Sequence, residues 1–260
     1  MLSTNLADSG IVTASSWLAS APPTRLQTHH TTRRWSGRIG DTEYILLVFD
    51  EPQAIDCVAL FRCAGIFNGE LRGLSSSATT RVRISSADVT GLTGDLYDSG
   101  AATGRIGSAD MSMIVLLPAE VTAKAVLIDI SQTGASALQA GRLVVGLTTP
   151  FTINFSYGWA HGYADLSRRT KSAGGLTFVD PDDSYKVMTL PFDFLDAADI
   201  DMVRTVDRLN GLRSDVLVIT DPEASDLPAV SIWGLMQDLN PPTQPGFSYF
   251  SKSYAIEERL

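Results

Sequence analysis

The stretch Tyr44-Ile-Leu-Leu-Val-Phe49 is a short, continuous apolar run bounded by polar residues. A run of this length is too short for a buried helix, so it predicts a strand at the centre of a sheet. A second run of this kind is Ala125-Val-Leu-Ile128. By contrast, Thr80–Ser85 alternates apolar and polar residues, which predicts a strand with one wet face. These three segments predict a β core with two central strands and one half-buried strand.

The first 148 residues continue this pattern of short apolar runs separated by Gly, Ser, Asp and Pro clusters. Such spacing is typical of a sandwich or barrel and differs from alternating strands and helices. Eight strands suit a jelly-roll-like β-sandwich. We expect them at Ile11–Ser15, Tyr44–Phe49, Ile55–Phe61, Thr80–Ser85, Asp95–Ser99, Met113–Leu117, Ala125–Ser131 and Arg142–Gly146.

A second β-rich region is predicted over residues 149–260, with one amphipathic helix at about 196–210. Ile200, Val203 and Val206 fall on one face of that helix, and Gly211 follows as a C-cap. The region opens with Phe151–Trp159, which alternates aromatic or apolar with polar residues. Further strands are expected at Tyr185–Phe194, Val216–Thr220, Val230–Leu239 and Phe247–Ile256. Pro191 lacks an N–H donor, so the strand that contains it should be an edge strand or bulged there.

The charge balance and the cysteines exclude several classes of partner and cofactor. The formal net charge is −9, which makes nucleic acid a poor partner. No apolar run reaches the length of a membrane helix, and the first residues lack the features of an export signal, so we expect synthesis and folding in a cytoplasm. Cys57 and Cys63 lie about 20 Å apart if they share a straight strand, too far for a disulfide. We expect two reduced, buried thiols and no metal or other cofactor.

No catalytic constellation is recognisable, so we expect the chain not to be an enzyme. His29, His30 and His161 lie in no nucleophile elbow and no His-Glu-x-x-His motif. Adjacent histidines in an extended chain point to opposite faces, which disfavours a metal clip. The acidic cluster 180–183 lacks the spacing of a calcium loop and reads as a turn. A cleft carboxylate pair, as in a polysaccharide depolymerase, is not marked in the sequence but is not excluded by it.

Two clusters are candidate binding sites. In the first, Arg33, Arg34 and Trp35 could stack on and hydrogen-bond a sugar, and Trp17 is a second candidate sugar platform. The alternative, which we favour, makes Trp35 a buried core anchor and pairs the arginines with acidic side chains. The second cluster, Arg168, Arg169 and Lys171, is a compact basic patch in an acidic chain. We expect it to face an acidic neighbouring subunit, because opposed potentials set register at interfaces.

The order of motifs in residues 1–148 resembles a discoidin-type (galactose-binding-like) domain of phage tail proteins. The segments that carry the resemblance are Asn5–Gly10, Ala14–Ser16, Leu26–His30, Arg33–Trp35, Asp56–Leu60, Arg81–Ser86 and Leu96–Gly100. The resemblance implies that the segment before the first long strand crosses one end of a sandwich. It also implies that the Arg-Trp pair anchors this segment to the core.

The second region is similar to the ring-forming domain of distal tail and minor tail proteins of long-tailed phages. The similarity rests on Asn154–Gly158, Arg168–Lys171, Tyr185–Phe194, Asp215–Pro222 and the closing Tyr254–Arg259. It implies a structural protein of the virion tail tip or baseplate, assembled in the host cytoplasm into a hexameric or trimeric ring. Its partners would be further copies of itself and the tail tube, tape-measure and hub proteins. The alternative function is a carbohydrate-binding module that recognises cell-surface glycans during adsorption.

Overall fold

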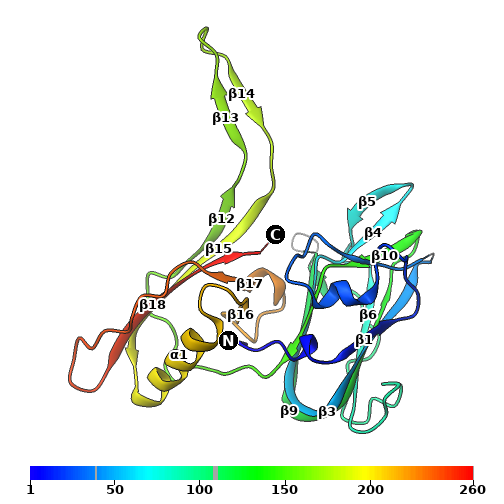
Figure 1. The fold of residues 1–260 in the computed structure, drawn as a ribbon, viewed down its shortest axis with the longest axis horizontal. Helices are drawn as coiled ribbons and strands as arrows, with labels where there is room; N and C mark the ends of the chain where they lie inside the picture. Colours follow the sequence, from blue (N-terminus) through cyan, green and yellow to red (C-terminus); the bar gives the residue numbers. More distant parts are fainter. Residues whose placement is uncertain (39, 108–110, 260) are drawn as a thin grey trace. The chain divides into compact units, whose positions relative to one another are not determined.

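The computed structural model describes residues 1–38, 40–107 and 111–259, so the last residue of the second predicted region, Leu260, lies outside the description. The chain divides into two compact units, each described here by itself (Figure 1). Unit 1 comprises Met1–Thr149 together with Ile219–Ser231. Unit 2 comprises Pro150–Val218 together with Ile232–Leu260.

Unit 1 is built on two long antiparallel strands, β3 (Thr42–Phe61) and β9 (Ser112–Ser131). Their pairing shifts register between Val48 and Gln53 and again between Ile55 and Cys57. Such irregularities bend a strand pair, so the two halves of this pair belong to different layers of the fold (Figure 1). Side chains from both halves, among them Leu47 and Leu60, lie in a single hydrophobic core. The predicted β-sandwich is confirmed.

The shorter strands of the seven-stranded sheet extend one or other half of the bent pair. β1 pairs with the first half of β3, which ends at Val48, and β6 pairs with the second half of β9, which begins at Ala125. β11 pairs with the second half of β3, and β8 pairs with the first half of β9. These strands are β1 (Ile11–Ala14), β6 (Thr79–Ser85), β7 (Tyr97–Asp98), β8 (Ile106–Gly107) and β11 (Arg142–Gly146). A second sheet has the order β2 (Trp35–Ser36), β10 (Ala137–Ala140), β4 (Ala64–Phe67), β5 (Glu70–Gly73).

Five of the strand predictions for unit 1 need correction. Four predicted strands are halves of β3 and β9, because the polar, Pro-containing segments between them bend without leaving the strand. The predicted strand Asp95–Ser99 shrinks to the two residues of β7. The carboxylate of Asp95 accepts hydrogen bonds from the backbone N–H (3.1 Å) and the hydroxyl (2.5 Å) of Ser86, which holds the start of that segment in a turn.

Unit 2 is a five-stranded antiparallel sheet with one helix. The strand order is β12 (Ala160–Asp165), β15 (Ser184–Leu195), β18 (Phe250–Glu258), β17 (Ser231–Met236), β16 (Val216–Ile219). The predicted helix is α1 (Ala197–Asn210), with Asp196 as its N-cap and Gly211, at φ 55°, as its C-cap. Its apolar residues Ile200, Val203 and Val206 are buried, and its Asp207 accepts hydrogen bonds from Lys252 and Tyr254 of β18, so the helix lies against the sheet.

The environment of Pro191 shows how a central strand accommodates proline. β15 lies between β12 and β18, so most of it is an inner strand of the sheet. Pairing with β12 ends at Thr189, and the register with β18 shifts between Phe192 and Leu195. Pro191 therefore lies where one neighbouring strand has ended, and no ladder bond needs its missing N–H.

Between β12 and β15 the chain forms a projecting hairpin, β13 (Arg168–Lys171) with β14 (Thr177–Asp180), which we call the arm (Figure 1). Every residue of both strands is exposed. No helix in the described residues is long and apolar enough to cross a membrane.

The state of the two thiols gives a direct test of the core of unit 1. Cys57 and Cys63 are free and buried, and burial raises the pKa of each thiol to about 12. Only the thiolate is a good nucleophile. We expect neither thiol to react with a disulfide reagent at pH 8 in the native protein, and both to react after denaturation. Rapid native labelling of either cysteine would contradict this packing.

Candidate binding surfaces

Trp35 is a core residue of unit 1. Its side chain is fully buried, and its indole N–H donates to the backbone carbonyl of Ser16 at 3.1 Å. β2, which carries it, pairs with Ala140 of β10, so the ring lies beneath the second sheet. An indole enclosed in this way has no free face for a sugar. The structure thus places Trp35 as the core-anchor alternative expects.

The other residues of that candidate cluster lie at the surface. Arg33 is exposed, Arg34 is half-buried, and Trp17 keeps 47% of its surface in solvent. The backbone carbonyl of Arg34 accepts from the guanidinium of Arg25 at 3.3 Å. Arg33 and Trp17 are therefore accessible, but Trp35 is buried, so the three side chains do not form one exposed cluster.

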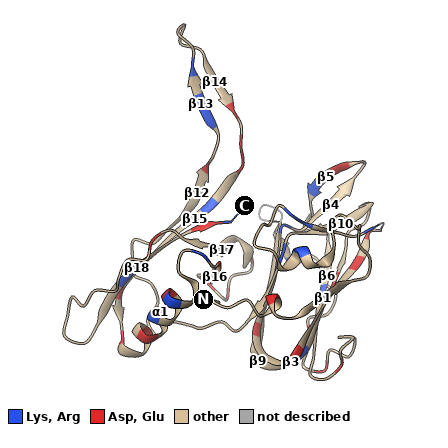
Figure 2. Cartoon of the chain, in the orientation of Figure 1, with Lys and Arg blue, Asp and Glu red and all other residues tan. Residues whose placement is uncertain are grey.

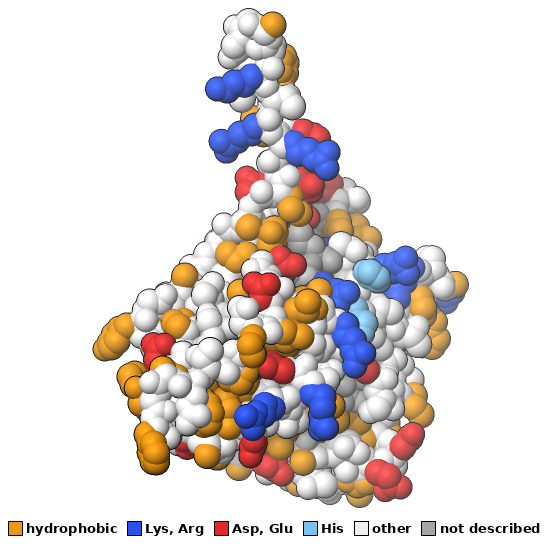
Figure 3. All heavy atoms as spheres, turned by 60° about the vertical axis from the view of Figure 1, so that its left-hand side comes forward, with side chains coloured by type: hydrophobic (Ala, Val, Ile, Leu, Met, Phe, Trp, Pro, Cys, Tyr) orange, Lys and Arg blue, Asp and Glu red, His pale blue; other side chains and the backbone are white. Residues whose placement is uncertain are grey.

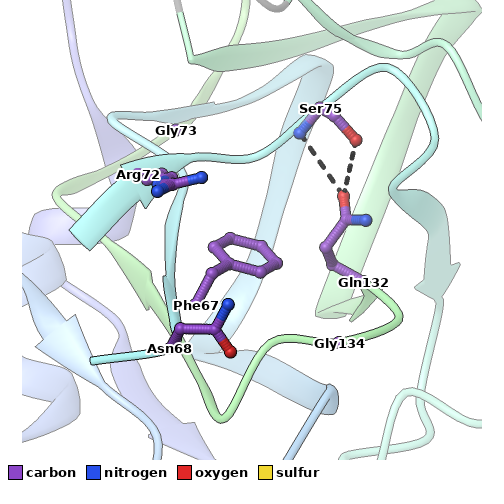
Figure 4. Close-up of a pocket in the computed structure, with 7 residues that line it drawn as sticks. All are labelled: Phe67, Asn68, Arg72, Gly73, Ser75, Gln132 and Gly134. Carbon is purple, nitrogen blue, oxygen red and sulfur yellow. Dashed lines mark hydrogen bonds between the residues drawn. The ribbon is translucent and has the colours of Figure 1, made fainter. Parts of the chain in front are cut away.

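A pocket that sequence reasoning missed opens at one end of unit 1 (Figure 4). Its volume is about 500 Å³. It is lined by Phe67, Asn68, Arg72, Gly73, Ser75, Gln132 and Gly134. The first four belong to the β4–β5 hairpin, and the others to the segments that follow β5 and β9. We call it the end pocket.

The hairpin that forms one wall of the end pocket turns at Asn68-Gly69. Both residues have positive φ, 52° and 85°, which asparagine and glycine tolerate best. This dipeptide is the strongest local hairpin signal in a sequence, and it could have located the wall. The turn sets the side chains of Phe67 and Asn68 beside Arg72, which Figure 4 shows facing the same space.

The opposite wall is held by Gln132. Its side-chain carbonyl accepts from the backbone N–H and the hydroxyl of Ser75, at 3.3 and 3.0 Å, and its amide donates to Ser77 at 3.1 Å. Gln132 is buried, so these bonds satisfy a polar group that could not otherwise be enclosed. Gln132 therefore fixes this wall of the end pocket, and contacts with a ligand would come from the other lining residues.

Arg72 is the charged group of the end pocket. Its guanidinium pairs with Glu70, but both side chains are mostly exposed. Such a surface ion pair contributes about 0–1 kcal/mol, so a ligand can replace it easily. A guanidinium, an amide and an aromatic ring around one cavity can together hydrogen-bond hydroxyl or carboxylate groups and cover an apolar face. No group of His, Cys, Asp and Glu in the described residues is arranged to hold a metal ion.

The basic patch Arg168, Arg169 and Lys171 lies on β13 of the arm (Figure 2). Across the hairpin, Arg169 pairs with Val179, and Thr170 pairs with Phe178. The arm is also apolar, because Leu176, Phe178 and Val179 are 68%, 58% and 55% exposed. The space-filling view shows basic and hydrophobic side chains standing on the arm in the open (Figure 3). The sequence indicated the charge but not the exposed apolar groups.

Comparison with known proteins gives matches to solved structures alone. No family model and no curated relative matches the sequence. The lectin domain of lectinolysin complexed with Lewis B antigen is 12% identical, with a TM-score of 0.44, over 57% of this chain and all of that domain. The fucose-binding module of Streptococcus pneumoniae is 13% identical, with a TM-score of 0.39, over 55% of this chain and 94% of the module.

A chitosan-binding module from a chitosanase/glucanase of Paenibacillus sp. IK-5 is 20% identical, with a TM-score of 0.39, over 55% of this chain and 98% of the module. These three structures are carbohydrate-binding modules by name, and none is a phage tail protein. All three TM-scores are below 0.5, so the sandwich fold of unit 1 rests on its own strand pairing. The tail-tip expectation stays a prediction.

Trp35 is buried and Trp17 is exposed, so replacing each should change the stability of the protein by a different amount. We expect Trp35→Ala to lower the free energy of unfolding by about 3–5 kcal/mol, as loss of a large buried aromatic does. Trp17→Ala should change it by less than about 0.5 kcal/mol, as is usual at the surface. Urea titrations followed by circular dichroism measure both. Equal effects of the two substitutions would contradict the placement of Trp35 in the core.

Proposed function

We propose that this chain is a structural subunit of a phage tail tip that assembles through the arm of unit 2. The observation that carries the proposal is the exposure of Leu176, Phe178 and Val179 on a projecting hairpin. The resemblance of the second region to ring-forming tail proteins gives the biological setting. In this proposal the chain performs no catalytic step.

The arm is poorly supported by its own chain. A two-stranded hairpin is marginally stable in water unless one face packs on something, and no residue of β13 or β14 is buried. Clustered exposed apolar side chains in a soluble protein mark interaction surfaces. A partner that covers these side chains would stabilise the hairpin and remove apolar area from water. The arm is therefore best explained as one half of an interface.

The charge of the arm indicates the kind of partner. Between residues 168 and 180 the chain carries Arg168, Arg169 and Lys171 but only one carboxylate, Asp180, whereas the whole chain is acidic. Opposed potentials favour an acidic partner, and a further copy of this chain is one. A contact in which each copy uses one surface to bind a different surface of the next copy closes into a ring when the rotation permits. The proposed hexameric or trimeric ring would then join the tail tube to tip proteins, with the tape-measure and hub proteins among its partners.

Assembly through the arm has a direct test. The variant Leu176→Ser, Phe178→Ser, Val179→Ser should be monomeric, because it removes the apolar contacts and leaves the body unchanged. Sedimentation equilibrium should show a multimer for the parent chain. A matched control is Val89→Ser with Leu92→Ser, since these side chains of unit 1 are equally exposed but lie off the arm. The control should keep the parent mass.

A monomeric parent chain at the highest soluble concentration would refute assembly by this chain alone. Failure to find the chain in purified tail particles by mass spectrometry would refute the tail-tip setting. These two measurements are independent of each other.

Glycan binding at the end pocket is a second candidate function. It is favoured by the convergence of Arg72, Asn68 and Phe67 on one open cavity, a set suited to a sugar with hydroxyl or carboxylate groups. On a tail tip such a pocket would serve adsorption to cell-surface glycans. The two functions are compatible, since they use different units.

Glycan binding can be tested with variants that spare the fold. Arg72→Ala removes the guanidinium, and Asn68→Gly removes the amide while keeping a residue that accepts positive φ. Each should weaken binding by about tenfold or more, as loss of a hydrogen bond to a charged or buried group does. Lys124→Ala is the control: it removes one positive charge about 26 Å along β9 from Gln132, at roughly 3.3 Å per residue.

A glycan array with the parent chain identifies the ligand, and calorimetry compares the variants. The second candidate is refuted if no glycan binds, or if Lys124→Ala weakens binding as much as Arg72→Ala does.

A further inference from the structure

The β4–β5 hairpin sets an aromatic ring beside a cation at the end pocket (Figure 4). Gly65 pairs with Arg72, and Phe67 pairs with Glu70. Residues that pair across a hairpin, and residues two apart on one strand, point to the same side, so these four positions share one face. Gly65 has no side chain, and a Cβ there would lie 3.0 Å from Cε2 of Phe67. The ring of Phe67 therefore lies over Gly65, across from Arg72.

Arg72 already binds a carboxylate of its own strand. Its Nη2 donates to Glu70, and the two side chains are 63% and 68% exposed. A guanidinium has five N–H donors, and this contact uses one of its nitrogens. An exposed ion pair is weak, because water screens it and two long side chains must be held in place. Glu70 therefore shows which group Arg72 accepts and leaves donors of the guanidinium for a ligand.

A carboxylate of a ligand would bind Arg72 better than Glu70 does. Guanidinium and carboxylate groups pair most strongly when two parallel N–H donors reach both oxygens. A ligand that lies against Phe67 also displaces water from the pocket, and charges attract each other more strongly where water is excluded. A hydroxyl is a neutral acceptor, and a hydrogen bond that involves two ions is stronger than one that involves a single ion. The end pocket thus favours a carboxylate over a hydroxyl beside Arg72.

The rest of the lining is neutral. Of the described residues that line the end pocket, Arg72 alone carries a charge. Ser75 and Gln132 are hydrogen-bonded to each other, which leaves the amide of Asn68 to bind hydroxyl groups. The net charge of −9 does not outweigh Arg72, because charges more than about 8 Å away are largely screened at physiological salt.

We propose that the end pocket selects glycans that carry a carboxylate, such as those built from uronic acids. Arg72 binds the carboxylate and releases Glu70, Phe67 covers the apolar face of the sugar ring, and Asn68 binds a hydroxyl. This inference rests on glycan binding as the second proposed function, and it names the substrate class of that site.

The test compares each acidic glycan with its own neutral form. The probes are oligosaccharides of galacturonic acid and of glucuronic acid, and the same oligosaccharides after their carboxylates are reduced to primary alcohols. Calorimetry with the parent chain should show binding of an acidic form at least about tenfold tighter than that of its reduced form, as loss of a charged partner implies.

A change at Glu70 tests the displacement of its carboxylate. Glu70→Gln removes the competing charge and should tighten binding of the acidic form by up to about fivefold, the upper limit for a surface ion pair. The matched control is Glu51→Gln, which removes an exposed carboxylate of β3. Glu51 lies about 30 Å along β3 from Thr42, at roughly 3.3 Å per residue, and Thr42 pairs with the neighbour of Gln132. The control should bind as the parent does, and thermal melts check that both variants are folded.

The results separate the inference from the function on which it rests. If the reduced forms bind as well as the acidic forms, or if the glycan array yields neutral glycans alone, selection of carboxylates is wrong and glycan binding stands. If Glu70→Gln binds the acidic form no better than Glu51→Gln does, the displacement of Glu70 is refuted. If no glycan binds at all, the second proposed function fails, and the inference fails with it.

Discussion

The pairing of β3 with β9 is the constraint on which unit 1 depends. β1, β6, β8 and β11 all bond to one of these two strands, and β7 bonds to β6. Because the pair bends at its register shifts, the same two strands serve both layers, and side chains from both halves meet in one core. The layers therefore cannot form separately. This pairing joins residues far apart in the sequence, which is typical of slow-forming β proteins.

The sequence predicted the parts of this fold that depend on local pattern. Apolar runs located both halves of β3 and β9, and helical periodicity with its caps located α1. The continuity of β3 was missed because Asp50–Gln53, polar and containing proline, has the composition of a turn. The exposure of Phe178 was missed for a different reason: an apolar residue in a hairpin has the same pattern whether a core or a partner covers it. Burial is a property of the tertiary structure that periodicity alone does not contain.

The candidate sites show the same difference between what the local sequence predicts and what only the tertiary structure decides. The Arg33-Arg34-Trp35 motif was visible in the sequence, but only the fold decides that the indole of Trp35 faces the core. The end pocket joins the β4–β5 hairpin to Gln132, more than fifty positions away, so no local motif could reveal it.

The walls of the end pocket come from short turns at the ends of strands, while the hydrophobic core lies along the strands themselves. A turn that contributes little to the core can change length or composition with little effect on folding, and recognition loops on rigid scaffolds diversify in this way. Related chains with altered turns could thus differ at the end pocket while keeping the same sandwich core. Specificity would then evolve through a few turn residues without any change to the strand pairing that holds unit 1 together.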